Sequence, residues 1–111
     1  MKIPFNAIIP DDKLNRYLLL PRDRDDKSKF LAQAGFTLKN SNALKAAIQV
    51  LVSNIEAVID TQNEYGTFFL VIGEITGTEN RHLSVTTIWM KRAIDQQFQF
   101  VTLKPYKERK L

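Results

Sequence analysis

The chain carries one histidine, His82, and histidine is the natural candidate for a general acid or base. It is the only side chain that in its ordinary state titrates near neutral pH, so it can both give and take a proton there. Ser84 and Thr86 follow His82 at every second position of a β-type segment, which places the three side chains on one strand face. This row indicates an acid–base site. The alternative is that His82 is an exposed residue at the start of a strand.

Two lysines near the expected start of a helix supply positive charge for such a site. Lys27 and Lys29 can bind phosphate together with His82 if the fold brings them close, whereas the alternative is that both are solvated surface lysines. The predicted catalytic residues are His82, Thr86 and Thr102. The predicted substrate-binding residues are Lys27, Lys29 and Ser84.

Other catalytic chemistries lack the residues that they require. The chain has no cysteine, which excludes thiolate nucleophiles and cysteine-based zinc clusters. One histidine and scattered carboxylates give no metal-ligand spacing, so we expect no metal and no cofactor. No serine lies in a nucleophile elbow, and no helix follows Gly73 and Gly77 to form a phosphate loop. Trp89 is expected in the core, with a stacking platform for a base as the alternative.

Length and charge set the class of protein. A chain of 111 residues is large enough to bury one core and is expected to form a single domain. No segment has the roughly 20 apolar residues of a membrane span, so we expect a cytoplasmic protein. Of the net charge of +4, residues 104–111 carry +3, so the basic character lies mostly in the basic tail, residues 105–111, and the adjoining Lys104. Such a tail either binds acidic partners or is a solvated terminus.

The expected elements follow the order helices first, strands second. Residues 1–10 are expected to form an extended arm packed by Phe5, Ile8 and Ile9, residues 11–54 a helical region, and residues 55–104 an antiparallel sheet. Either Asp25 or Asp26 can cap the second helix. The third helix has one continuous apolar face. The residues of that face are Leu44, Ala47, Ile48, Leu51 and Val52. The segregation predicts an α+β fold, in which the arm and three helices pack on one face of a three- to four-stranded antiparallel sheet.

Alternation along the strands divides the sheet into two faces. Leu83, Val85, Thr87 and Trp89 are expected to point toward the helices, and His82, Ser84, Thr86, Ile88 and Met90 away from them. The last strand is expected to alternate without interruption, with Phe98, Phe100, Thr102 and Lys104 on one side. Gly73 suggests a bulge or a close approach of the backbone. Because the outer face is half apolar, it is either covered by a second layer or exposed as a ligand or partner surface.

A set of residues spread over nearly the whole chain resembles a small family of uncharacterised bacterial domains that is common in cyanobacteria. The pattern consists of Lys13, Tyr17, Lys27, Lys29, Phe30, Gly35, Phe36, Gly66, Thr87, Ile88, Trp89, Phe100, Val101, Thr102 and Pro105. This resemblance implies a family of unknown function and brings no assigned activity.

Helices followed by an antiparallel sheet are also similar in outline to the small ribonuclease toxins of the barnase and colicin type. Members of such groups use His, Lys, Thr or Glu on the sheet to hydrolyse RNA by acid–base chemistry, and the likeness implies that His82, Thr86 and Thr102 lie on such a face. Two functions therefore remain open. One is a non-enzymatic interaction module, a homo-oligomer or the binder of a small protein partner, and the other is a ribonuclease-like enzyme acting on RNA.

Overall fold

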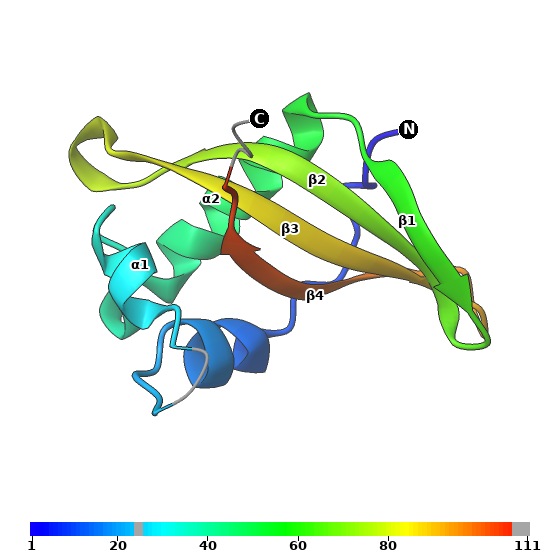
Figure 1. The fold of residues 1–111 in the computed structure, drawn as a ribbon, viewed down its shortest axis with the longest axis horizontal. Helices are drawn as coiled ribbons and strands as arrows, with labels where there is room; N and C mark the ends of the chain where they lie inside the picture. The colour runs from blue at the N-terminus through cyan, green and yellow to red at the C-terminus, as the bar shows by residue number, and fades with distance from the viewer. Residues whose placement is uncertain (24–25, 108–111) are drawn as a thin grey trace.

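The computed structural model describes residues 1–23 and 26–107 and shows an α+β fold with one four-stranded antiparallel sheet in the order β1-β2-β3-β4 (Figure 1). The strands are β1 Val58–Asn63, β2 Gly66–Thr76, β3 His82–Arg92 and β4 Phe98–Pro105. The helices are η1 Lys13–Leu18, α1 Ser28–Ala32, η2 Leu38–Asn40, α2 Ser41–Asn54 and η3 Thr78–Asn80. Only α2 is long, and the rest of the helical region is built from single turns. Most of the basic tail, residues 108–111, lies outside the described residues.

Helix α2 lies against β2 and carries the apolar face that the sequence predicts. All five residues of that face are buried, as the hydrophobic spacing requires. Gly73 explains how closely the helix approaches, because a Cβ added there would lie 2.7 Å from Cδ1 of Leu51. The register between β2 and β3 runs through Gly73 without interruption. The close approach is therefore the correct reading of this glycine, and the expected alternative of a bulge is wrong.

The inner face of β3 is fully buried, as predicted, and its polar groups are satisfied within it. The indole Nε1–H of Trp89 donates to the hydroxyl oxygen of Thr87 at 2.9 Å. That hydroxyl in turn donates to the backbone oxygen of Val71 at 3.0 Å. Trp89 also packs edge-on against Phe100, with ring centroids 5.3 Å apart. This tryptophan is thus a core residue, and no face of it is free to stack on a base.

Strand β4 contains a bulge that the alternation pattern does not reveal. Phe100 lies opposite Trp89, whereas Thr102 lies opposite Ile88, so Val101 is an extra residue. After a bulge the side chains exchange faces, because alternation has a period of two. The expected grouping of Phe98, Phe100, Thr102 and Lys104 on one side is therefore wrong. The residues buried on the inner face are Phe98, Phe100 and Leu103, and Thr102 and Lys104 lie on the outer face.

The N-terminal arm is anchored by its backbone and two side chains. Ile8 forms a parallel bridge with Gln99 on β4, with hydrogen bonds of 2.9 and 2.8 Å to Phe98 and Phe100. The side chains of Ile3 and Ile9 are buried, but Phe5 is 96% and Ile8 36% exposed, so the expectation that Phe5 and Ile8 pack the arm is wrong and only that for Ile9 is confirmed. Proline and the tight turn that follows it direct this ring outward, since the N–H of Ala7 donates to the oxygen of Pro4.

Helix η1 follows the arm and contacts both β4 and α2. It therefore lies along the edge of the sheet that the arm has reached. No helix within residues 1–23 and 26–107 is long and apolar enough to cross a membrane.

Candidate functional site

A basic pocket of about 290 Å³ lies where η1 and the loop after it meet the edge strand β4. The lining residues are Lys13, Tyr17, Leu18, Arg22, Lys27, Val101 and Thr102. We call this group the basic pocket. It combines three cationic side chains with one phenol and one aliphatic hydroxyl, which is the chemistry that binds an anion.

Helix η1 presents two of these side chains because it is anchored on its other side. Leu14 and Leu18 are buried, so the opposite side of the turn, with Lys13 and Tyr17, faces outward. The turn is a π-helix, in which the N–H of Leu19 donates to the oxygen of Leu14 at 2.9 Å. Such widened turns are rare and frequently lie at functional sites. The ammonium group of Lys13 lies 5.3 Å from the centre of the Tyr17 ring, which holds both side chains over the pocket.

The loop between η1 and α1 adds Arg22 and Lys27. The guanidinium of Arg22 lies 5.5 Å from the centre of the Tyr17 ring. Asp26 accepts hydrogen bonds from the N–H and the hydroxyl of Ser28, at 2.8 and 2.5 Å. These bonds, together with one from the backbone of Arg22, hold the pKa of Asp26 below its ordinary value. The N-cap of this helix is Lys27, so the expectation that Asp26 occupies the cap is wrong; Asp26 lies one residue earlier and accepts from Ser28, and Asp25 lies outside the described residues.

Asp26 therefore lies between the two cations of this segment. Its carboxylate accepts from the backbone N–H and the hydroxyl of Ser28, the residue after Lys27, and it also interacts with the backbone of Arg22. The ammonium group of Lys27 donates to Oγ1 of Thr102 at 3.3 Å. Since 75 residues separate these two side chains, only the tertiary fold brings them together. The bulge at Val101 contributes directly, because it points Thr102 away from the core and toward Lys27.

The electrostatic character of the basic pocket is positive. Within the part of the chain that the structure describes, no Asp or Glu lines it, and neither Lys13 nor Arg22 forms an ion pair. Two acids at the start of η1 pair with cations outside the pocket, Asp12 with Arg16 and Asp11 with Lys45, and the carboxylate of Asp26 accepts from Ser28. Lys13 and Arg22, two cations beside a small hollow, can attract and hold a negatively charged group.

His82 lies at the other end of the sheet. It is exposed at the start of β3 and pairs in register with Thr76, whose hydroxyl lies 2.9 Å from Nδ1 of the ring. A carboxylate oxygen of Glu74 lies 3.9 Å from the same nitrogen. Thr102 faces Ile88, six residues further along β3, which places it about 20 Å from the position of His82 along the strand.

The other predicted site residues lie in different surroundings. Thr86 lies on the outer face opposite Lys104 and is buried, and its position is diagonal to Thr102. Ser84 is exposed, and its backbone oxygen accepts the N–H of Tyr106 at 2.9 Å. Lys29 lines a different, mostly apolar hollow, because residues two apart do not face the same way on a helix. The structure thus brings Lys27 and Thr102 together, and it separates both from His82, Ser84 and Lys29.

Three polar residues of the basic pocket, Lys13, Tyr17 and Arg22, were not among the predicted site residues. Lys13 and Tyr17 are four residues apart, and such spacing places two side chains on the same side of a helix. That signal was present in the sequence. Arg22 gave no such signal, because its place depends on the loop that Asp26 fixes.

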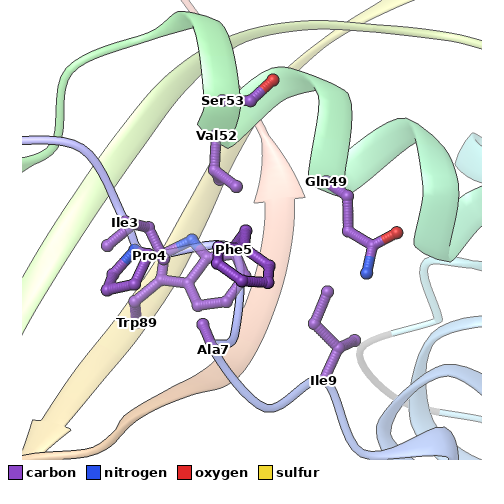
Figure 2. Close-up of a pocket in the computed structure, with 9 residues that line it drawn as sticks. All are labelled: Ile3, Pro4, Phe5, Ala7, Ile9, Gln49, Val52, Ser53 and Trp89. Atoms are coloured by element: carbon purple, nitrogen blue, oxygen red, sulfur yellow. The ribbon is translucent and has the colours of Figure 1, made fainter.

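A second hollow, of about 300 Å³, lies between the N-terminal arm and α2 (Figure 2). Its lining residues are Ile3, Pro4, Phe5, Ala7, Ile9, Gln49, Val52, Ser53 and Trp89. This lining contains no ionisable side chain, and the hydroxyl of Ser53 donates to the backbone oxygen of Val50. Among the described residues no group of three or more metal-ligating side chains is arranged around one point. The basic pocket is therefore the better candidate for chemistry.

Comparison with known proteins places the fold and the family. A chain in the solved structure of a contact-dependent growth inhibition toxin–immunity protein complex from Klebsiella pneumoniae 342 has a similar fold, with a TM-score of 0.61. The two chains are 15% identical, and the match covers 93% of this chain and 96% of the other, so the likeness shows the fold alone. No curated protein matches the sequence significantly. The model of a domain of unknown function, DUF6883, matches residues 5–107, and the chain therefore belongs to that family.

Proposed function

We propose that the protein is a ribonuclease-like domain of the toxin type that binds an RNA phosphate in the basic pocket. The observation that carries this proposal is the convergence of Lys13, Arg22 and Lys27 around Tyr17 and Thr102, with no carboxylate among the described lining residues. A phosphodiester is the anionic group of RNA, and lysine and arginine are its usual ligands. The fold shared with a chain of a toxin–immunity complex is consistent with this class. We also propose that the protein acts in the cytoplasm, where RNA is abundant.

The residues of the basic pocket suit cleavage by attack of the ribose 2′-hydroxyl. The 2′-oxygen bonds to phosphorus, the bond from phosphorus to the 5′-oxygen breaks, and the products are a 2′,3′-cyclic phosphate and a 5′-hydroxyl. The 2′-hydroxyl loses its proton to water, and the phenol of Tyr17 gives a proton to the leaving 5′-oxygen. Negative charge grows on the phosphate oxygens during this step. Lys27, Arg22 and Lys13 stabilise that charge, and Thr102 donates a hydrogen bond to it.

The experiment is an RNA degradation assay with product analysis. Wild-type protein should release fragments that end in 2′,3′-cyclic phosphate, and Lys27→Ala should lower the rate at least about 100-fold. Lys39→Ala is the matched control, because Lys39 is an exposed lysine outside the basic pocket. His82→Ala tests the competing assignment with His82 as the acid or base. A rate that falls in His82→Ala but not in Lys27→Ala would move the catalytic site to the His82 end of the sheet.

The outer sheet face favours a second candidate, a non-enzymatic interaction module. Val58 and Ile72 on this face are 64% and 40% exposed, which is unusual for residues on a covered sheet. A small protein partner, as in the toxin–immunity complex of the structural neighbour, or a second copy of the chain would bury them. Light scattering over a range of concentrations tests the oligomer. A concentration-dependent dimer together with no RNA cleavage would favour this candidate.

A further inference from the structure

An apolar row on the outer sheet face begins at the basic pocket. Thr102, which lines the pocket, lies opposite Ile88 on β3. Ile88 lies opposite Leu70 on β2, and Leu70 opposite Val58 on β1. Each of these side chains is at least partly exposed. Because neighbouring strands lie about 4.8 Å apart, Ile88 is one strand and Leu70 two strands away from Thr102.

Two flanking rows widen this surface. On one side Phe68 lies opposite Met90, and Met90 opposite Gln99. On the other side the neighbouring row consists of Ile72, Thr86 and Lys104. The surface next to Thr102 is thus apolar in its middle, with an amide on one flank and a cation on the other. We call the part formed by Ile88, Leu70, Met90 and Phe68 the apolar platform.

We infer that the apolar platform binds the base of the nucleotide next to the phosphate held in the basic pocket, and that the substrate is therefore unpaired RNA. This inference rests on the proposed function. The base and the phosphate of one nucleotide are joined through a single sugar, and Thr102 and Ile88 are likewise close, because they lie on neighbouring strands about 4.8 Å apart. Bases of single-stranded RNA are free to leave the stack and lie on an apolar surface, whereas bases inside an A-form duplex are not.

Charge and continuity favour this occupant over a protein. Thr102 lines the basic pocket and lies opposite Ile88 of the apolar platform. A ligand with an anionic group next to a flat apolar group therefore meets cations in the pocket and apolar side chains on the platform. A nucleotide has this combination. Lys104, exposed beside Thr86, can contact the following phosphate. Gln99 and Thr102 offer hydrogen-bonding groups to the edge of the base.

The test measures binding of a 2′-O-methyl pentanucleotide, which cannot be cleaved, by fluorescence anisotropy. The same oligonucleotide is made with one abasic position at a time, and also as a perfect duplex. One abasic position should weaken binding about 10-fold, the other positions less than about 2-fold, and the duplex should bind at least about 10-fold more weakly than the single strand. Equal effects at all positions, or equal binding of the duplex, would overturn the inference.

Variants locate the platform and separate this inference from the proposed function. In Ile88→Ala the sensitive abasic position should lose its effect, whereas in Val58→Ala, at the far end of the row, it should keep it. Thermal melting checks that both variants are folded, and the abasic scan of wild-type protein stands without them. In Lys27→Ala all oligonucleotides should bind more weakly by a similar factor. If Lys27→Ala abolishes binding but all abasic positions have the same effect, the phosphate site in the basic pocket is supported and the base site on the apolar platform is refuted. If wild-type protein binds no oligonucleotide, both proposals fail, and if a dimer buries the apolar platform, this inference alone fails.

Discussion

The two ends of strand β3 differ in the charged groups that lie beside them. At one end, His82 lies beside Glu74 and Thr76, which are neighbours on the same sheet face. A carboxylate oxygen of Glu74 there lies 3.9 Å from Nδ1 of the imidazole ring. At the other end, the strand faces Thr102 and the basic pocket, where Lys13 and Arg22 form no ion pair with any described residue. The basic pocket therefore offers cations to an anion from outside the protein, whereas at the His82 end the carboxylate of Glu74 already lies beside the ring.

The difference shows that a titratable residue is informative only together with its partners. His82 draws attention because histidine is the usual acid or base, but its ring is exposed and lies beside the carboxylate of Glu74 and the hydroxyl of Thr76. The basic pocket contains no histidine, and its residues come from η1, from the following loop and from β4. Convergence of charge from segments far apart in the sequence is the stronger indication of a binding site.

Charge reversal should separate the two ends most strongly. The double variant Lys13→Glu and Arg22→Glu should weaken binding of single-stranded RNA by more than about 1,000-fold, because two attractive contacts become repulsive. The measurement is fluorescence anisotropy at fixed salt. Lys39→Glu is the control for net charge and should change binding by less than about 3-fold. A similar loss in the control would show that the chain binds RNA through its overall charge and not in the pocket.

Removal of one threonine hydroxyl at each end of β3 gives a matched comparison with a smaller expected effect on the cleavage rate. Thr102→Val deletes the oxygen that accepts from Lys27 and should lower the cleavage rate about 5- to 10-fold, as expected for one lost hydrogen bond. Thr76→Val deletes the hydroxyl next to His82 and should leave the rate unchanged. The reverse pattern would assign the reaction to the His82 end.

The parts of this comparison that the sequence predicts are those set by local periodicity. The apolar face of α2 and the inner face of β3 follow from spacings of 3.6 and 2, and both are confirmed. Thr102 shares the outer face with His82 and Thr86, as the likeness to ribonuclease toxins implies. The alternation along the last strand was not predictable, because a bulge at Val101 adds one residue without any glycine or proline to mark it. The contact of Lys27 with Thr102 depends on that bulge and on the loop that Asp26 holds, so neither alternation nor helical spacing reveals it.

The salt dependence of RNA binding should show which lysines contact phosphate. For single-stranded nucleic acid, the slope of log K against log salt changes by about 0.7 for each phosphate contact that is lost. Lys27→Ala should therefore reduce the slope by about that amount, and Lys29→Ala, whose side chain lines another hollow, should not. An unchanged slope in Lys27→Ala would mean that Lys27 serves only to hold Thr102.

Asp26 should give the smallest effect and should act only through the loop. Its pKa in the folded protein is lowered from the ordinary value of 3.8 by the hydrogen bonds from Ser28. The stabilisation is therefore fully present above about pH 4 and is lost as the pH falls through the lowered folded-state value. Asp26→Asn should lower the melting temperature by a few degrees at pH 6, and the difference from wild type should vanish below the folded pKa.

The same variant tests how the loop serves the basic pocket. Because Asp26 binds backbone groups near Arg22 and Ser28 and does not line the pocket, Asp26→Asn should weaken RNA binding about 2- to 5-fold with an unchanged salt slope. At the His82 end, Glu74→Gln is the matched carboxylate-to-amide change and should leave binding unaltered. If Asp26→Asn instead strengthens binding, the carboxylate opposes the anion through space, and its charge outweighs its role in fixing Arg22 and Lys27.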